Sequence, residues 1–497
     1  MRPTNLHFKL IQYNQYNERV LNMTNNSETI ARTSEEREAV TNHLKSEGGN
    51  WVTGSPDYTS FIRRVLSNKL KQVYNAVLSE TNAPVGEVDS AYEKSQFFVD
   101  STFDFYEGKK DLGRKIGRAF VVPMRSNRED EHYSSESTPF YPLLDPQRFG
   151  VTSDIRMRTM YGLPPAILDT YLKSDDDKET GALVLCPMYS DMISDIRPDR
   201  DNFSQKIRLL EVGGFVLEKT SRFAHLQLGA NVVGLGATLP KVTNFGHALR
   251  GIDGMENLVT TTGHGGTVYM IVETAKKIME ETSVESCGKI GVIGGAGSIG
   301  WSSTVAAIEM IKGHEILSYD LNSERLYGMI GNNKKANKVA VADSVSEVLR
   351  DTNIIITAVT GRIDLGSEEY DGLDLTGKVI IDDSQPGCFD AEQVRAKGGE
   401  LVWVVGEDAS ENKFITRDGY YTEGAPYNYG NESGLFGNYS EFACGQEAAV
   451  IRQSEEFQNA ITGPVTPDNV RIVGAMFRAA RIQVAPFQAF GQPVSIA

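Results

Sequence analysis

The sequence contains few cysteines, and they follow no pairing or metal-binding pattern. Four of the 497 residues are cysteine, and they stand far apart in the chain: Cys186, Cys287, Cys388 and Cys444. No CxxC pair or zinc-ligand spacing occurs among them, which argues against a disulfide framework or a cysteine-based metal centre. We therefore expect a reduced, cytoplasmic protein with no metal, whose thiols are structural or catalytic.

Long apolar runs and an excess of positive charge are also missing. No stretch approaches the roughly 18 apolar residues that a membrane span requires, and residues 1–20 lack the apolar core of a secretory signal. We therefore expect no integral membrane segment. The net charge of −16 argues against nucleic acid as a partner, because neutralising phosphates requires a basic surface.

The sequence does contain a glycine motif, which stands between an apolar run and a predicted helix. The apolar run 289–293 leads into a glycine-rich turn, residues 301–312 read as a helix, and Asp320 ends the next apolar run. Strand, glycine turn, helix, strand and acid form the dinucleotide-binding fingerprint, in which the helix N-terminus favours a bound pyrophosphate. The expected cofactor contacts are Gly295, Gly297, Ser298, Ile299, Gly300 and Asp320.

Asp320 also bears on the choice of cofactor. Its carboxylate can accept hydrogen bonds from ribose hydroxyls, whereas a 2′-phosphate would meet like charge. The sequence therefore favours NADH over NADPH. Arg325, five residues further on, keeps NADPH open, since a guanidinium can accommodate the phosphate.

Further apolar runs predict a parallel sheet covered on both faces. The runs at 338–342, 353–360, 378–384 and 400–406 show little alternation and are separated by helical segments. Ligands bind at the carboxyl ends of such strands. We therefore expect residues 358–361 and 382–386 to border the cofactor, with Val359 and Thr360 contacting it, and Arg362 to be a solvated loop charge.

These patterns predict an α/β fold with a doubly wound Rossmann-type nucleotide domain. Short apolar runs at 118–124, 181–188 and 231–236, with a long amphipathic helix over 203–228, indicate an α/β substrate domain ahead of it. The predicted divisions are a mostly helical extension of unknown role at 1–130, the substrate domain at 131–285, the nucleotide domain at 286–415, and a loop with C-terminal helices at 416–497 that packs on the substrate domain.

The predicted extension carries no recognisable chemistry. Residues 25–49 and 58–80 have helical spacing of apolar residues, and 126–139 read as a solvated loop. The extension is expected to pack on the core or to bind a protein partner.

Two other segments carry candidate catalytic groups. Residues 261–267, Thr-Thr-Gly-His-Gly-Gly-Thr, lead into a helix predicted over 268–281, so Thr261, Thr262 and the helix N-terminus form a possible oxyanion or phosphate cradle. His264 within it is either catalytic or a solvent-facing or capping histidine. Cys444 lies near a helix start after a long Gly, Asn and Tyr-rich loop. The helix dipole would activate its thiol if it lies in the first turn, and otherwise it is a small core residue.

Together these segments resemble the long-chain acyl-[acyl-carrier-protein] reductases, the aldehyde-forming enzymes of cyanobacteria. The resemblance spans roughly residues 180–455 at low identity, and its segments occur in the same order as in that family: Leu235-Gly-Ala, Thr261-Thr-Gly, Thr267-Val-Tyr, the glycine motif 294–300, Glu324-Arg-Leu, Ile381-Asp-Asp, Pro386, Phe442-Ala-Cys444 and Glu447-Ala448. Phe442-Ala-Cys444 is the most specific of them.

The resemblance implies NAD(P)H-dependent reduction of an acyl thioester, carried by acyl-carrier protein or coenzyme A, to an aldehyde. Cys444 would carry the acyl group. This chain departs from the family at Asp320, where a basic residue is usual, and at His264 and Gly266, where the family has Asn and then His. The extension and the long loop have no counterpart in the family.

Two other functions fit the same residues. One is an NAD(P)-dependent dehydrogenase of a small amino or hydroxy acid with a shikimate-dehydrogenase-like fold and no covalent step. The other is a non-catalytic nucleotide-sensing protein whose extension binds a partner.

Overall fold

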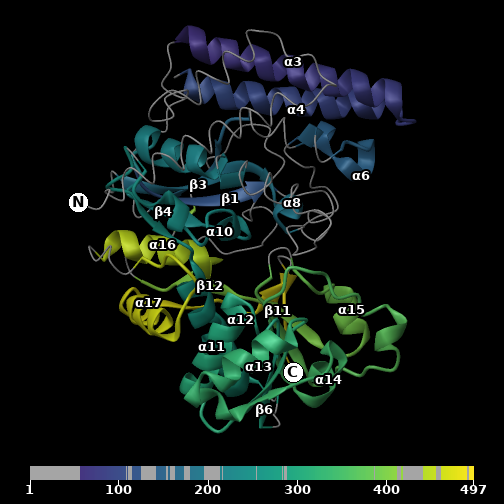
Figure 1. The fold of residues 1–497 in the computed structure, drawn as a ribbon, viewed down its shortest axis with the longest axis vertical. Coiled ribbons are helices and arrows are strands. Elements are labelled where there is room, and N and C mark those ends of the chain that lie inside the picture. Colours follow the sequence, from purple (N-terminus) through teal and green to yellow (C-terminus); the bar gives the residue numbers. More distant parts are fainter. Residues whose placement is uncertain are drawn as a thin grey trace, which may run out of the picture.

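The computed structural model forms two α/β lobes with a helical hairpin on the outer face of one of them (Figure 1). The residues that it describes are 56–107, 109, 115–124, 141–152, 155–156, 163–172, 179–194, 213–214, 216–252, 254–282, 284, 288–384, 387–410, 416–417, 440–454, 460–489 and 492–496. The predicted segments at 25–49 and 126–139, the long loop at 418–439, the start of the helix predicted at 203 and Pro386 lie outside these residues.

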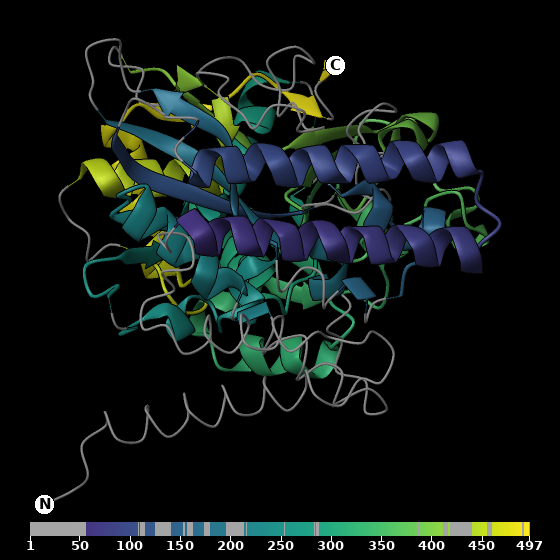
Figure 2. The same cartoon turned by 90° about the horizontal axis from the view of Figure 1, so that it is seen from above.

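Helices α3 (Pro56–Glu80) and α4 (Val85–Tyr106) form the hairpin and lie side by side across one end of the molecule (Figure 2). Leu70 of α3 and Phe98 and Phe103 of α4 belong to the same buried apolar cluster as the strands beneath them. The predicted helix at 58–80 is therefore confirmed, and it packs on the core.

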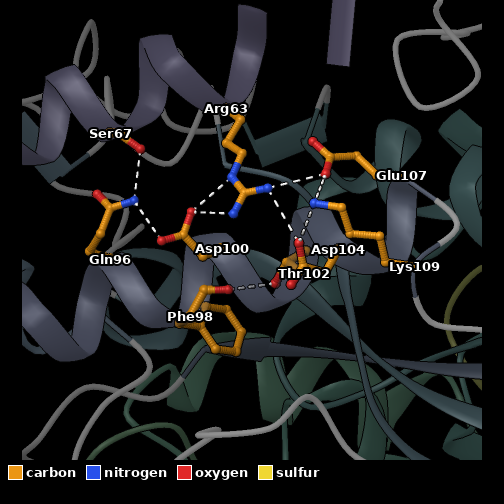
Figure 3. Close-up of polar contacts among 9 residues, drawn as sticks. All are labelled: Arg63, Ser67, Gln96, Phe98, Asp100, Thr102, Asp104, Glu107 and Lys109. Atoms are coloured by element: carbon orange, nitrogen blue, oxygen red, sulfur yellow. Dashed lines mark hydrogen bonds and ion pairs between the residues drawn. The ribbon is translucent and has the colours of Figure 1, made fainter. Parts of the chain in front are cut away.

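A network of ion pairs also joins the two helices (Figure 3). Arg63 of α3 pairs with Asp100 of α4 at 2.7 Å and with Asp104 at 3.3 Å. It also reaches Glu107 just beyond α4 at 3.2 Å, and Lys109 pairs with Glu107 at 2.7 Å. Arg63 therefore fixes the crossing of the hairpin at the end where α4 leads into the sheet.

The sheet under the hairpin is mixed, with the order β13-β2-β3-β1-β4-β5. Strand β1 pairs in parallel with both β3 and β4, β5 pairs in parallel with β4, and β2 runs antiparallel to β3. The strands are β1 (Lys115–Met124), β2 (Ala166–Leu172), β3 (Glu179–Tyr189), β4 (Val232–Leu235), β5 (Val259–Thr261) and β13 (Thr416–Arg417). The strand predicted at 118–124 thus lies inside the sheet, so the helical part of the 1–130 segment ends before β1.

The second sheet is wholly parallel, with the order β11-β10-β9-β6-β7-β8. Counted from β6, this is the order 3-2-1-4-5-6 that characterises dinucleotide-binding folds. Its strands are β6 (Lys289–Ile293), β7 (Glu315–Tyr319), β8 (Val339–Val341), β9 (Ile354–Thr357), β10 (Val379–Asp382) and β11 (Glu400–Trp403). Strands β6, β9 and β10 have no exposed residue, as expected for a sheet covered on both faces. The predicted fold class, a Rossmann-type domain beside a second α/β domain, is confirmed.

The helices of this lobe follow the strands in turn. They are α12 (Ser298–Met310) after β6, α13 (Ser323–Gly331) after β7, α14 (Val345–Asp351) after β8 and α15 (Ala391–Ala396) after β10. The Asn322 side chain accepts a hydrogen bond from the backbone N–H of Arg325 and so caps α13.

Three helices and a small sheet connect the lobes. Helix α11 (His264–Glu281) runs from β5 of the first sheet to β6 of the second, and α16 (Ala443–Gln453) and α17 (Pro467–Ala479) pack against it. Strand β12 (Val405–Asp408) continues from β11 and pairs antiparallel with β14 (Ser440–Phe442) and β15 (Ile482–Val484). Strand β14 passes directly into α16, so Cys444 lies between the lobes.

The shorter elements are β16 (Gln488–Ala489), β17 (Gln492–Pro493), α6 (Pro146–Phe149), α8 (Ser190–Ser194), α10 (Leu239–Val242), the π-helical turn Phe223–Gln227, and the 3-10 turns Pro142–Leu144, His247–Leu249, Lys334–Lys338 and Glu368–Tyr370. Within the described residues, no helix combines the length and the apolar character needed to cross a bilayer.

Candidate functional site

The glycine motif takes the shape that the fingerprint predicts. A Cβ on Gly300 would collide with the Gly294 carbonyl oxygen, and a Cβ on Gly295 would collide with the Ser318 hydroxyl of β7. Gly297 is the N-cap of α12, and a Cβ there would meet only the Gly294 oxygen at 3.2 Å and the Ala358 oxygen at 3.9 Å. The motif therefore packs closely where helix meets strand and is less crowded at Gly297, where a pyrophosphate would approach.

Asp320 holds the same turn from the end of β7. One carboxylate oxygen accepts the Ala296 N–H at 2.9 Å, and the other accepts the Asn322 N–H at 2.8 Å. Each oxygen keeps a lone pair for a ribose hydroxyl. Asp320 thus positions the glycine turn and retains the ribose-binding capacity predicted for it.

The loop after β9 covers the motif from the other side. A Cβ on Gly294 would lie 2.8 Å from the Val359 side chain, and the Val359 N–H donates to the Ser384 hydroxyl at 3.3 Å. Thr360 follows and is exposed, as is Arg325. The structure therefore brings Val359 to the glycine motif, while Arg325 stands exposed in the first turn of α13.

The second group of candidate residues gathers around the start of α16. Cys444 is the second residue of α16 and half-buried, so it lies in the first turn rather than one turn inside. Gly263, with φ +73°, is the N-cap of α11. A Cβ on Gly263 would collide with the Cys444 Cβ and lie 2.7 Å from its Cα. Only glycine fits this position, so α11 and α16 meet end to end at Cys444.

The anion cradle expected at 261–267 is present, but the protein itself fills it. Thr261 donates its hydroxyl to Glu447 Oε1, and the Gly266 N–H donates to Oε2 at 2.6 Å. Glu447 is fully buried. Sequence reasoning assigned this cradle to a substrate oxyanion or phosphate. The Cys444–Glu447 spacing of three residues, which places both side chains on one helix face, is the sequence signal that could have pointed to Glu447.

Burial and nearby charge set the protonation of these groups. Burial raises the pKa of Glu447 to about 7, although the hydrogen bonds from Thr261 and the α11 amides act in the opposite direction. Burial, followed by the negative charges of Asp383, Glu441 and Glu447, raises the pKa of the Cys444 thiol despite its helix position. We call Asp383, Glu441 and Glu447 the carboxyl cluster. The free protein therefore holds Cys444 as a neutral thiol.

Asp383 ties this cluster to the nucleotide domain. It follows β10 directly and is half-buried, and burial together with its neighbour Asp382 raises its pKa well above the usual value. Asp382 itself accepts hydrogen bonds from Thr357, the Ser384 N–H and the Cys388 N–H. Asp383 thus stands at the carboxyl end of β10, and its charge is one of the causes that raise the pKa of the Cys444 thiol. That residues 382–386 border the cofactor stays a prediction.

His264 is the first residue of α11 and is buried, with 8% of its surface exposed. It is therefore neither solvent-facing nor a cap. Its ring meets the Phe245 ring edge-on at 5.9 Å, and its buried Nδ1 has no hydrogen-bond partner among the described residues. Burial lowers the pKa of His264 to about 4, so its imidazole is neutral at pH 7.

One segment that the sequence did not single out links the two groups of residues. Ile461 accepts a hydrogen bond from the Thr262 N–H at 2.9 Å and donates its N–H to the Thr261 hydroxyl at 3.1 Å. Four residues later the Val465 N–H donates to the Ser298 hydroxyl at 3.2 Å. Residues 461–465 thus join the Cys444 side to the first turn of α12, and no sequence motif predicts this contact.

The loop over His264 has a strained backbone. Asn244 and Phe245 have φ of 49° and 56°, and Gly246 follows at 84°. Such non-glycine conformations cost about 1–3 kcal/mol each and persist where the surroundings impose them. Here the Gly463 N–H donates to the Phe245 carbonyl at 2.8 Å, which holds Phe245 against His264.

Comparisons with known proteins give no family and only weak structural likenesses. No protein-family model and no curated protein matches the chain. Among solved structures, L-tryptophan dehydrogenase from Nostoc punctiforme is 10% identical with a TM-score of 0.26, over 73% of this chain and 88% of that one. The A chain of dipicolinate synthase from Bacillus subtilis is 16% identical with a TM-score of 0.24, over 35% of this chain and 56% of that one. The chain therefore spans little more than half of the latter. At such scores, neither likeness carries an argument about function.

Proposed function

We propose that this chain is an NAD(P)H-dependent oxidoreductase that reduces an acyl thioester to an aldehyde through an acyl group carried on Cys444. The observation that supports this most is the position of Cys444. Its thiol lies in the first turn of α16, between the lobes, where the charge of Asp383 from the carboxyl end of β10 acts on it. Ligands of open parallel sheets bind at that edge. The resemblance to acyl-[acyl-carrier-protein] reductases supports the same function.

The residues around the glycine motif fit a nicotinamide dinucleotide. The free N–H groups at the start of α12 would hold the pyrophosphate, Asp320 the ribose, and Val359 and Thr360 the neighbouring part of the cofactor. When bound, the cofactor supplies the hydride. Because Asp320 places a negative charge at the ribose, we propose NADH as the preferred donor.

The chemistry at Cys444 is a thiol exchange followed by reduction. The Cys444 sulfur bonds to the thioester carbonyl carbon, the carbon–sulfur bond to the carrier breaks, and the carrier leaves as a thiol that takes the proton. One thioester replaces another, so the step is close to isoenergetic. After the acyl carbon is reduced, its bond to the Cys444 sulfur breaks, and the thiol and a free aldehyde result. Either acyl-carrier protein or coenzyme A fits this chemistry as the carrier.

A second function, a dehydrogenase of a small amino or hydroxy acid, is favoured by one observation. Burial, together with the carboxyl cluster, keeps Cys444 protonated in the free protein, and a neutral thiol is a poor nucleophile. Glu447, with a pKa raised to about 7, has the acidity of a general base that works near neutral pH. In that function Cys444 would take no part in the reaction.

Acyl transfer to the protein separates these two functions. The wild type and Cys444→Ala are incubated with acyl-CoA of several chain lengths, and the intact mass is followed. The proposed function predicts one acyl adduct on the wild type, none on Cys444→Ala, and aldehyde release when NADH is added. Cys186→Ala, which removes a thiol buried in β3, is the matched control and should still be acylated.

If Cys444→Ala released aldehyde at the wild-type rate, the covalent step would be wrong. If instead it oxidised an amino or hydroxy acid with NAD as fast as the wild type, the dehydrogenase would be the correct function. Nucleotide binding without turnover of any substrate would favour the non-catalytic alternative.

A further inference from the structure

The proposed reduction needs a hydrogen-bond donor for the acyl oxygen, and candidate donors lie at the start of α11, which meets Cys444 at Gly263. Both acyl transfer to Cys444 and reduction of the acyl group place negative charge on the carbonyl oxygen. Removing such a donor commonly slows acyl-transfer enzymes about 100- to 1,000-fold. The donor must lie close to Cys444, because the acyl carbon is bonded to its sulfur.

The donors at the start of α11 are already committed. The Thr261 hydroxyl donates to Glu447 and accepts from the Ile461 N–H. The Gly266 N–H also donates to Glu447, and the Thr267 N–H donates to the Gly263 carbonyl at 3.1 Å. Thr261 and these amides therefore stabilise the protein's own carboxylate.

His264 is different in three respects. It is more than nine-tenths buried, its Nδ1 has no hydrogen-bond partner among the described residues, and it directly follows Gly263, which contacts Cys444. Because neighbouring Cα atoms are about 3.8 Å apart, the His264 Cα lies within roughly 8 Å of the Cys444 Cα. Buried polar atoms are rarely left without a partner, and an exception calls for an explanation.

We propose that the His264 imidazole, with its proton on Nδ1, donates a hydrogen bond to the carbonyl oxygen of the acyl group on Cys444. This inference rests on the proposed function and assigns a catalytic role that the fold alone does not. A neutral imidazole can polarise a carbonyl without giving up its proton, as one known isomerase demonstrates. The low pKa of His264 suits this role, because no charge has to be buried before the substrate arrives.

The strained loop above His264 serves the same arrangement. The edge-on contact from Phe245 limits rotation of the imidazole, and the bond from Gly463 holds Phe245 in place. A donor fixed before the substrate binds stabilises developing charge without reorganisation. The strained backbone at Asn244 and Phe245 thus lies where it places Phe245 against the imidazole and so helps to position the donor.

Two substitutions of His264 test this role, because a hydrogen-bond donor and a packing residue predict opposite orders of their acylation rates. Asn in place of His264 retains an N–H donor near the position of Nδ1, whereas Leu retains the apolar volume and removes the donor. Acylation of Cys444 by acyl-CoA is timed by intact mass without any nucleotide. His264→Leu should slow acylation about 100- to 1,000-fold, and His264→Asn should keep it within about tenfold of the wild type. Both variants should unfold cooperatively and bind NADH as the wild type does.

A packing role predicts the reverse order, with His264→Leu faster than His264→Asn, and that result would overturn the inference. Thr262, whose buried hydroxyl accepts the His264 N–H at 3.4 Å, is the competing donor. If Thr262→Val slowed acylation and His264→Leu did not, the oxyanion donor would be Thr262. Failure of the wild type to take up an acyl group would instead refute the proposed function, and this inference with it.

Discussion

The nucleotide side and the thiol side of the site are assembled in opposite ways. The glycine turn, α12 and Asp320 come from one stretch of about 30 residues, and each contact within it follows from local spacing. The thiol side brings together Cys444, Gly263, Asp383 and residues 461–465, which are up to about 200 residues apart in the chain. A function that needs both sides therefore depends on the helices that join the lobes. Substitutions confined to one side should leave the other intact.

Gly300→Val is expected to give the largest difference between its effect on NADH binding and its effect on acylation of Cys444. A side chain there would collide with the Gly294 carbonyl, so the turn must open, and NADH affinity should fall at least about 100-fold. Acylation of Cys444 without nucleotide should continue at close to the wild-type rate. Gly328→Ala in α13, where no described residue lies within 4 Å of an added Cβ, is the matched control and should bind NADH normally. Parallel loss of acylation in Gly300→Val would show that the two sides are not independent.

Glu447→Gln tests the thiol side through the pH dependence of the protein's free energy of unfolding. The pKa of Glu447 is raised to about 7 in the folded protein from an ordinary value of 4.5. Its contribution to stability is therefore fully present below about pH 4.5 and is lost as the pH rises through 7. The wild-type free energy of unfolding should fall by up to about 3 kcal/mol from this group over that range.

A neutral glutamine does not titrate, so urea unfolding of Glu447→Gln between pH 5 and 8 should give a shallower pH dependence than the wild type. At every pH the variant should be less stable, since its amide N–H₂ would face the Thr261 hydroxyl and the α11 amides. Equal slopes in the two proteins would mean that Glu447 is already ionised at pH 5.

Asp320→Asn tests the preference of the nucleotide side for NADH over NADPH. Asparagine keeps an acceptor for the Ala296 N–H and removes the negative charge that disfavours a 2′-phosphate. The ratio of NADPH to NADH affinity should rise about tenfold, equivalent to about 1.4 kcal/mol, as read by fluorescence titration. An unchanged ratio would place the determinant of cofactor preference elsewhere, with Arg325 as the next residue to vary.

The smallest effect is expected far from both sides. Arg63→Ala removes the partly exposed ion pairs that join α3 and α4, and pairs of this kind contribute about 1 kcal/mol or less. The thermal midpoint should fall by about one degree or less, with acylation and NADH binding unchanged. A change in either activity would show that the hairpin influences the site.

The sequence predicted the nucleotide side in detail because its contacts are local. The glycine spacing, the capping Asn322 and the apolar strand runs each specify their own backbone. The sequence also predicted strands β1, β3 and β4. It grouped β1 with a helical extension, because the pairing of β1 with β3, about 60 residues later in the chain, leaves no local pattern.

On the thiol side the sequence identified Cys444, Thr261 and His264 but not how they are arranged. The occupation of the cradle by Glu447 and the bridge at 461–465 depend on long-range packing. The sequence predicts a lowered pKa for Cys444 only if the residue lies in the first turn of its helix. It does lie there, but burial and the carboxyl groups, which come mostly from the fold, raise the pKa.

The most direct test of the central claim, that the two sides form one reducing centre, is a single-turnover measurement. Wild-type protein is first acylated on Cys444 with acyl-CoA, freed of excess thioester, and mixed with NADH. The account predicts that the acyl mass disappears, one aldehyde forms and one NADH is consumed per acyl group, all at the same rate. An acyl adduct that persists with NADH bound and unoxidised would contradict it.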